Sequence, residues 1–330
     1  MAPALPLRKP SPGRSPRRQT RLRLVDVDHR FVRARDGTEL SVRHWPGPKD
    51  RPTLVLCDGL GCDGYVWRYL VEDFAGVLPI VHWQYRGHGH SAVPDDLDSI
   101  SMHLAVDDLE HVIDAFSPDA PVLLMGHSMG VQVCLEAYHQ LPERVAGLSL
   151  VCGSYEHPIE SFHGAATADG KPPVRNRMMR KVVFPLLTST FIRRPRVPQR
   201  LWSRIVPMRV IYEFAIRTEV NGERLSEDDF RPYFHHIGHM DMRVFARFAK
   251  SLADHSAKHV LPTIDVPTFV VGAGKDTFTP GWRSDHMHAA IPDADYLFIV
   301  DGTHTAPIEH PELVSLRFEK FLEERFGLLR

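Results

Sequence analysis

The sequence has no long apolar run and little cysteine. No stretch of its 330 residues approaches the roughly 18 to 20 consecutive apolar residues that span a bilayer, so no membrane-spanning helix is predicted. The four cysteines form neither a C-x-x-C pair nor a spaced framework, which is typical of buried thiols in a reducing compartment. Together these absences lead us to expect a cytoplasmic protein without a disulfide scaffold.

The chain also lacks an excess of charge of either sign. Its 40 Lys and Arg residues balance 41 Asp and Glu residues, so we expect no nucleic-acid partner. The amino-terminal segment differs: residues 1–20 hold five prolines and five basic residues, and no acidic residue precedes Asp26. This composition predicts a disordered basic tail, because the prolines oppose the amphipathic helix that a mitochondrial targeting segment needs.

Short apolar runs and helix-like segments alternate along most of the chain. β-rich runs are expected at 22–27, 30–34 and 39–45, buried strands at 53–57, 78–83, 121–125 and 145–151, and helices at 66–74, 102–116 and 131–141. Continuous apolar runs of this kind are typical of strands buried on both faces. The pattern predicts an α/β fold, with a mostly parallel sheet, helices on both faces and sites at the carboxyl ends of the strands.

This alternation stops over residues 156–262, where helix-like patterns such as 241–255 predominate. It then resumes with apolar runs at 268–271 and 296–300, a helix-like segment at 282–290 and an amphipathic helix at 311–326. The sheet would be incomplete without the last two strands. We therefore predict one α/β domain, made of 21–155 and 263–330, with a helical cap inserted at 156–262.

The pentapeptide from Gly126 to Gly130 has a serine at its centre and lies between a predicted strand and a predicted helix. In that context a G-x-S-x-G pattern forms a sharp turn that exposes the hydroxyl of Ser128. A serine needs a base within hydrogen-bond reach and a third group that orients the base. Asp276 and His304 follow the last two predicted strands, in the order Ser, Asp, His that this arrangement requires.

With these residues the chain resembles the α/β-hydrolase superfamily from about residue 22 to its end. Asp58-Gly59 and Trp67 stand where the family has a His-Gly pair and a tryptophan nine positions after the histidine. Residues 86–91 resemble the family's R-G-x-G-x-S loop, and the insertion falls after the sixth strand, where the family carries its helical cap. The resemblance implies the α/β-hydrolase fold.

The resemblance also implies a mechanism. Ser128 would attack an acyl carbonyl, His304 would take its proton, and Asp276 would fix the imidazole tautomer. The backbone N–H groups of Met129 and Leu60 would form the oxyanion hole.

One position departs from the family pattern, because Asp58 replaces the usual histidine. A carboxylate beside a developing oxyanion is unfavourable unless it points away or is hydrogen-bonded, which makes Leu60 the less secure donor. Gly59, Trp67 and Tyr155 are candidate substrate-binding residues, and Tyr155 is equally suited to the core.

These features predict a cofactor-independent serine hydrolase of carboxylic esters, similar to monoacylglycerol lipases and carboxylesterases. Serine at the nucleophile position argues against haloalkane dehalogenases and epoxide hydrolases, which use a carboxylate there. A C–C bond hydrolase or an acyltransferase with the same triad remains an alternative. A receptor for a small ligand, with a slow triad, is an alternative of a different class.

The cap contains a basic segment with an apolar centre. Residues 171–208 hold ten Lys or Arg and no Asp or Glu, around the apolar run 182–192. Such a segment suits an anionic amphiphile, an acyl carrier or a membrane surface. The alternative is a cap whose apolar residues face the active site while its arginines are solvated. From the apolar centre we expect a preference for medium or long acyl chains.

Histidine is abundant, and a cluster of His235, His236, His239 and Asp241 raises the question of a metal. Ligands at these spacings could share a helix face. We expect Gly238 to interrupt any such helix, and so predict no metal site.

Overall fold

The computed structural model describes residues 26–164 and 174–328. The predicted basic tail, residues 1–20, lies outside the described residues, as does most of the run expected at 22–27. The first described strand begins at Asp28.

Eight strands form one sheet in the order β1-β2-β4-β3-β5-β6-β7-β8. They are β1 (Asp28–Arg33), β2 (Glu39–Trp45), β3 (Leu54–Cys57), β4 (Ile80–Trp83), β5 (Val122–His127), β6 (Val145–Val151), β7 (Thr268–Ala273) and β8 (Asp295–Ile299). The β1–β2 and β2–β4 pairs are antiparallel, and all other pairs are parallel. The predicted mostly parallel sheet is confirmed.

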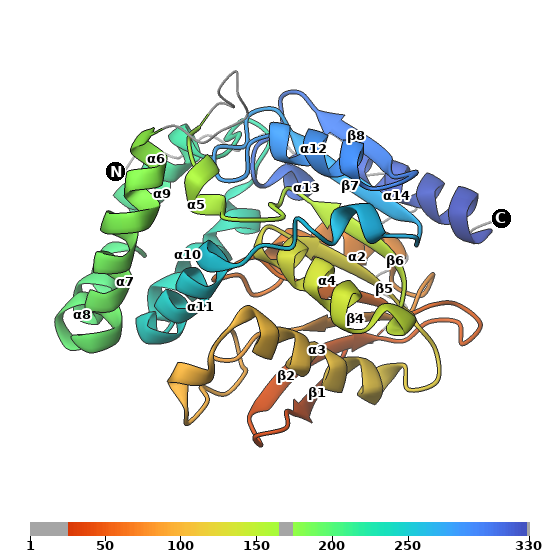
Figure 1. Ribbon diagram of the computed structural model, residues 1–330, viewed down its shortest axis with the longest axis horizontal. Helices are drawn as coiled ribbons and strands as arrows, with labels where there is room; N and C mark the ends of the chain where they lie inside the picture. Colours follow the sequence, from red (N-terminus) through yellow and green to blue (C-terminus); the bar gives the residue numbers. More distant parts are fainter. Residues whose placement is uncertain (1–25, 165–173, 329–330) are drawn as a thin grey trace, which may run out of the picture.

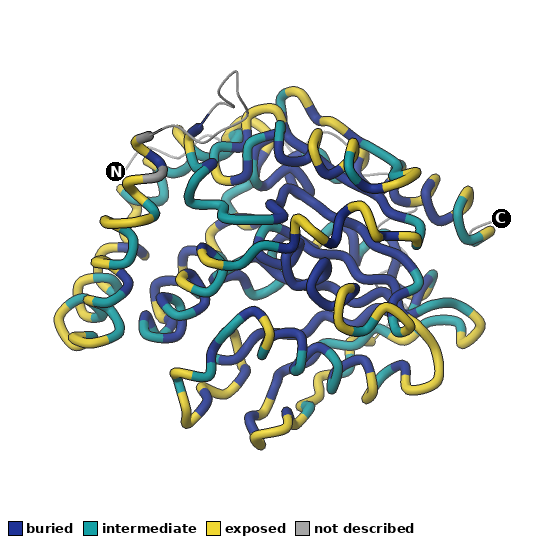
Figure 2. Tube along the Cα trace, in the orientation of Figure 1, coloured by how far each residue is buried: buried dark blue, intermediate teal, exposed yellow. Residues whose placement is uncertain are grey.

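Helices cover both faces of this sheet (Figure 1). Those outside the β6–β7 segment are α2 (Arg68–Phe74), α3 (Met102–Phe116), α4 (Met129–Gln140), α12 (Trp282–Ala290), α13 (Ala306–Glu309) and α14 (Pro311–Phe326), with 3-10 turns at Tyr65–Trp67, Leu97–Ser99, Pro142–Arg144 and Leu261–Thr263. Successive strand residues pack on opposite faces, so Val55 joins the core beneath α3 and α4 while Leu56 joins the core beneath α2 and α14. The central strands are buried throughout (Figure 2), which is why they read as unbroken apolar runs.

A second group of helices lies between β6 and β7. It comprises α5 (Pro158–Ser161), α6 (Val174–Met178), a π-helical turn (Met179–Val183), α7 (Phe184–Arg193), α8 (Arg196–Ile205), α9 (Arg209–Thr218), α10 (Glu227–His239) and α11 (Met242–Asp254). The chain enters and leaves this group at one place, because Glu156 and Ser256 form a β-bridge and the His157 N–H donates to the His255 carbonyl.

The expectation that Gly238 interrupts a helix is wrong, since α10 runs through it to His239. A Cβ at position 238 would lie 2.6 Å from Pro207 Cγ, so the glycine lets the segment after α8 pack closely on α10. This close contact outweighs the roughly 1 kcal/mol that glycine costs inside a helix.

None of the helices in residues 26–164 and 174–328 combines the length and the apolar character needed to cross a membrane.

Candidate active site

Ser128 occupies a strained turn between β5 and α4, with a backbone φ of 56°. Such a conformation persists in a non-glycine residue only where its surroundings enforce it. The two flanking glycines make the turn possible: a Cβ on Gly126 would lie 2.3 Å from the Gly130 carbonyl oxygen, and a Cβ on Gly130 would lie 2.1 Å from the Cys57 carbonyl oxygen. The serine therefore stands at the carboxyl edge of the sheet on a tightly packed elbow.

The structure brings the three predicted triad residues together from the ends of three strands. His304 Nε2 lies 2.9 Å from Ser128 Oγ, and His304 Nδ1 lies 2.9 Å from Asp276 Oδ2. Because a carboxylate only accepts hydrogen bonds, Nδ1 carries the proton in the neutral imidazole. Nε2 is then free to accept the proton of the serine hydroxyl.

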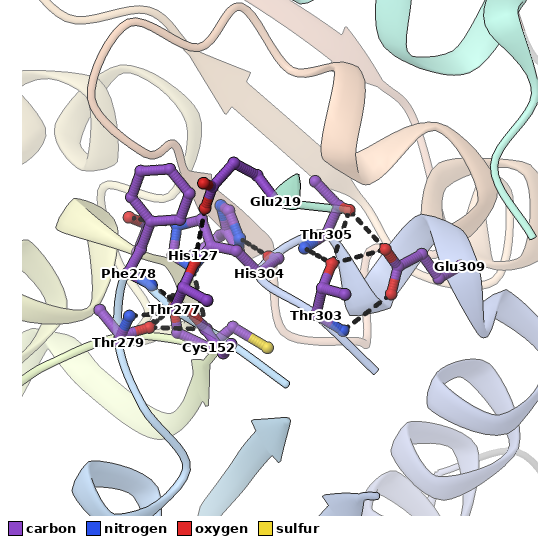
Figure 3. A network of polar contacts seen from close by, with 12 residues as sticks. His127, Cys152, Glu219, Thr277, Phe278, Thr279, Thr303, His304, Thr305 and Glu309 are labelled. Carbon is purple, nitrogen blue, oxygen red and sulfur yellow. Dashed lines mark hydrogen bonds and ion pairs between the residues drawn. The ribbon is translucent and has the colours of Figure 1, made fainter. Parts of the chain in front are cut away.

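Asp276 is held by the loop that follows β7. Its Oδ1 accepts hydrogen bonds from the N–H groups of Phe278 (2.9 Å) and Thr279 (2.8 Å), and its side chain is fully buried. The Thr279 hydroxyl lies 2.8 Å from both Asp276 Oδ2 and the Cys152 carbonyl oxygen (Figure 3). These hydrogen bonds fix the Asp276 side chain in the rotamer that contacts the imidazole.

The loop that carries His304 is held from its other side by Glu309 of α13 (Figure 3). The buried Glu309 carboxylate accepts hydrogen bonds from Thr303 N–H (2.8 Å) and from the hydroxyls of Thr303 (2.5 Å) and Thr305 (2.9 Å). A fourth hydrogen bond, of 2.8 Å, comes from the N–H of Asn221, in the segment between α9 and α10. Glu309 thus joins the histidine loop to the helices inserted between β6 and β7.

The predicted oxyanion-hole residues flank the serine. Met129 is the first residue of α4, so its N–H has no acceptor within the helix. On the other side the backbone of Gly59 lies so close that a Cβ there would be 3.1 Å from Ser128 Cβ. Leu60 follows directly and is only partly buried.

A family model described as the alpha/beta hydrolase fold matches residues 52–311, which include the elbow, all three triad residues and the loop of Gly59. The chain belongs to the α/β-hydrolase family. The predicted membership and fold are confirmed.

Comparison with known proteins gives distant relatives with several activities. The protein named "Probable oxidoreductase EphD" of Mycobacterium tuberculosis is 25% identical over 306 residues, which cover 89% of this chain and 49% of that protein. The chain spans about half the length of this mycobacterial relative. The 3-oxoadipate enol-lactonase 1 of Acinetobacter baylyi is 21% identical, with 91% of this chain and 99% of that protein covered.

Among solved structures, a thermophilic esterase from Thermogutta terrifontis superposes with a TM-score of 0.67 at 18% identity, covering 90% of this chain and 98% of that one. At such identity the likeness concerns the fold.

In this α/β hydrolase the Asp58 carboxylate is fully buried. Trp67 Nε1 donates to its Oδ1 (2.7 Å), and His82 Nε2 lies 2.8 Å from its Oδ2. Burial raises the pKa of Asp58, but the attraction of His82, the hydrogen bonds and Arg43 outweigh burial and lower the pKa below its usual value. The carboxylate is therefore charged and satisfied, which meets the condition for an oxyanion hole beside it.

His88, in the loop that resembles R-G-x-G-x-S, contacts the segment that follows Asp58. Its Nε2 lies 3.1 Å from the N–H of Gly61, and its Nδ1 lies 3.1 Å from the Arg86 carbonyl oxygen. Since the carbonyl only accepts, Nδ1 carries the proton and Nε2 accepts from Gly61. Burial lowers the pKa of His88 to about 4, so the neutral form required by this geometry is the stable one.

His127 lies beside the triad without joining it. Its Nε2 donates to the His304 carbonyl oxygen at 2.8 Å, and burial lowers its pKa to about 4. A neutral ring here adds no positive charge that would oppose protonation of His304.

Two predicted substrate-binding residues occupy other positions. Trp67 is 2% exposed and donates its indole N–H to Asp58, so it supports the segment that follows β3. Tyr155 is also 2% exposed. The guanidinium carbon of Arg283 lies over its ring, 5.0 Å from the ring centroid. Gly59 lies beside Ser128, since a Cβ there would be 3.1 Å from Ser128 Cβ.

The three histidines of the predicted cluster fall on α10, where the rings of His235 and His239 lie 4.5 Å apart, centroid to centroid, with a tilt of 33°. Asp241 is the N-cap of α11. In the described part of the chain no three His, Cys, Asp or Glu side chains are grouped so as to hold a metal ion.

Sequence reasoning missed Thr279, Glu309, His82 and the role of His88. The short Asp276-to-Thr279 spacing is a local turn signal that could have indicated Thr279. No sequence pattern indicates Glu309 or His82, because their contacts depend on how loops from different strands meet.

Proposed function

We propose that this α/β hydrolase is a serine esterase that cleaves carboxylic esters through an acyl-enzyme. The observation that carries the proposal is the bridging position of His304, with Ser128 Oγ and Asp276 Oδ2 each 2.9 Å from its two ring nitrogens. In the first step Ser128 Oγ bonds to the ester carbonyl carbon as its proton passes to His304 Nε2. His304 then returns that proton to the departing alcohol, and water repeats the sequence to release the acid.

Asp276 stabilises the imidazolium that forms, and the N–H groups of Met129 and Leu60 are the proposed donors to the oxyanion. One such donor contributes about 3 to 4 kcal/mol of transition-state stabilisation in comparable sites. These steps use only groups of the chain itself, so we propose no cofactor.

We further propose a preference for medium or long acyl chains. Apolar side chains lie beside His304 and beside the segment that follows Gly59: Phe278 is 5.0 Å from His304, ring centre to ring centre. From α10 and α11, Ile237 and Phe245 approach Gly61 so closely that a Cβ there would be 3.1 and 3.3 Å from them. These residues extend the apolar surroundings from the triad to the inserted helices, residues 156–262, which we propose to act as the cap.

The mechanism is tested with p-nitrophenyl esters and a fluorophosphonate probe. Ser128→Ala should abolish labelling and lower kcat by at least about 1,000-fold, since the residual rate comes from binding and the oxyanion hole alone. Ser203→Ala on α8 is the matched control and should retain wild-type labelling and kcat. Labelling of Ser128→Ala at the wild-type rate would rule out Ser128 as the nucleophile. A wild-type protein that neither reacts with the probe nor hydrolyses any ester would favour the receptor alternative.

Substrate class is tested with esters graded from acetate to laurate, together with a thioester and a lactone, because one relative is named an enol-lactonase. We expect kcat/KM to rise with acyl length by roughly fourfold per CH₂ until the apolar surface is filled. Highest kcat/KM on acetate, with no gain from longer chains, would contradict the acyl preference. Turnover of a C–C substrate, or transfer to an alcohol in place of water, would favour the alternatives with the same triad.

All four cysteines are buried and unpaired. This fits a reducing compartment, and we propose that the enzyme acts in the cytoplasm. Fractionation of cells that make the full chain tests this location.

A further inference from the structure

Helix α8 shows two stripes of side chains to solvent. Val197, Leu201 and Ile205 recur every four residues and are 64%, 53% and 44% exposed. Arg196, Arg200 and Arg204 precede them by one position each and are also exposed. Because residues four apart share a helix face, the helix presents an apolar stripe directly beside a basic one.

The remaining face of α8 is fixed against the helices beneath it. Gln199 donates to the Met240 carbonyl oxygen and accepts from the Met242 N–H, at 3.0 and 2.8 Å. Trp202 Nε1 donates to the Ile237 carbonyl oxygen at 2.8 Å, and Val206 is buried. The polar and aromatic side chains of α8 thus pack against the protein. The apolar stripe is therefore exposed on a helix that is already packed.

Helix α7 continues the apolar surface. It packs on α11 as α8 packs on α10, so the opposite sides of α7 and α8 face outward together at one end of the molecule (Figures 1 and 2). On its outward side Leu186 is 68% exposed, and Leu187, Val182 and Val183 are exposed beside it. We call the outward side chains of Val182–Leu187 and of α8 the α7–α8 face.

The charge of this face has one sign. Arg193 ends α7 and Arg194 follows it in the turn to α8, next to the three arginines of α8, and residues 174–208 contain no Asp or Glu. Within the described residues none of these five arginines forms an ion pair. Elsewhere exposed arginines such as Arg30 and Arg231 have carboxylate partners.

We propose that the α7–α8 face docks this enzyme on the surface of an anionic phospholipid bilayer. Aliphatic side chains that project from a rigid helical hairpin match the headgroup–acyl boundary, and flanking arginines match anionic headgroups. A second copy of the chain is a poorer partner, because two faces of one positive sign repel each other. The proposal concerns binding and does not rest on the proposed ester hydrolysis.

The test is flotation of the full chain with vesicles of phosphatidylcholine alone or mixed with phosphatidylglycerol. The wild type should bind the mixed vesicles, and Arg196→Gln/Arg200→Gln/Arg204→Gln should bind them on the order of a hundredfold more weakly, since each arginine contributes roughly fivefold. Leu186→Ser/Leu201→Ser should weaken binding by at least about tenfold.

The matched control is Leu313→Ser/Leu316→Ser, which removes two exposed leucines of α14 at the opposite end of the molecule (Figure 1). It should bind as the wild type does, with all variants keeping the wild-type near-UV circular dichroism. An equal loss in this control would overturn the proposal. A wild type that binds no vesicles would also overturn it. In that case, a dimer in light scattering that Leu186→Ser/Leu201→Ser disrupts would assign the face to self-association, and binding of a soluble acidic protein would assign it to a protein partner.

Discussion

Asp58 shows how a single side chain departs from the pattern of a family without disturbing the site beside it. Its two oxygens accept from two different donors, the indole of Trp67 and the imidazole of His82. Arg43 Nε donates to His82 Nδ1 at 3.2 Å, because an arginine only donates, and the N–H group at His82 Nε2 faces the carboxylate. The chain of donors runs in one direction and ends on Asp58.

This direction makes a prediction for Asp58→Asn. An amide offers one acceptor and one donor, so whichever way it is placed, an N–H group meets a donor of Trp67 or His82. We expect a loss of roughly 3 kcal/mol in the free energy of unfolding, since buried donors are left unsatisfied.

Urea unfolding of Asp58→Asn measures this loss, and Asp95→Asn on the exposed surface is the control. A denaturation midpoint and slope unchanged from the wild type would show that the hydrogen bonds from Trp67 and His82 to Asp58 contribute little to stability.

At this scale the sequence predicts which side chains meet where their positions follow from a motif and a strand end. Ser128, Asp276 and His304 were identified because each stands in a glycine-containing segment after an apolar run. Thr279 and Glu309 were not, because they act by fixing a neighbour through contacts that only the folded loops create.

The loop between β8 and α13 is the element that places the imidazole. Glu309 gathers the N–H and hydroxyl of Thr303, the hydroxyl of Thr305 and the N–H of Asn221 on one carboxylate. All four are donors, and their partner is itself buried. The Glu309 carboxylate, which only accepts hydrogen bonds, therefore orders the loop.

Glu309→Gln is predicted to disturb this positioning without removing a reacting group. The new NH₂ group must face at least one of the four donors, so the His304 loop shifts. We expect kcat for a p-nitrophenyl ester to fall about tenfold with little change in KM, because a misplaced base affects the chemical step.

The rate of fluorophosphonate labelling should fall in parallel with kcat. Glu319→Gln, on the exposed side of α14, is the control and should have neither effect. A variant with normal kcat and labelling but a lower thermal midpoint would give Glu309 a purely structural role.

Elements with a strong period were predicted closely. The helices at 102–116, 282–290 and 311–326 have the bounds of α3, α12 and α14. α10 was not predicted, because a glycine that normally weakens a helix is used there for close packing against Pro207. The helices between β6 and β7 have mixed exposure, so their order and contacts could not be derived from periodicity.

For the whole molecule, the buried histidines couple stability to pH. Burial lowers the pKa of His88 and of His127 to about 4, from an ordinary value of 6.5. For His88 the nearby His236 lowers the pKa further, while the Arg86 carbonyl and Asp58 oppose the shift. Between these two pH values the unfolded chain binds protons that the folded chain does not. Stability is therefore complete above the unfolded pKa and is lost as pH falls toward 4.

We predict that lowering the pH from 7 to 5 reduces the free energy of unfolding by roughly 2 kcal/mol for each of these histidines. Urea unfolding at the two pH values measures the loss. His88→Gln should make the loss smaller by about one histidine's share, whereas His29→Gln on the surface should not change it. A loss that is the same in all three proteins would assign the pH dependence to other groups.

The narrow neck at Glu156 and Ser256 has an evolutionary consequence. Because the two ends of the inserted segment are already paired, the sheet closes in the same way whatever length of chain lies between them. Recombination at these two points would exchange the insert as one unit, and Ser128, Asp276 and His304 all lie outside it. What the insert contacts can therefore change in one step without any change to the strands that carry these three residues.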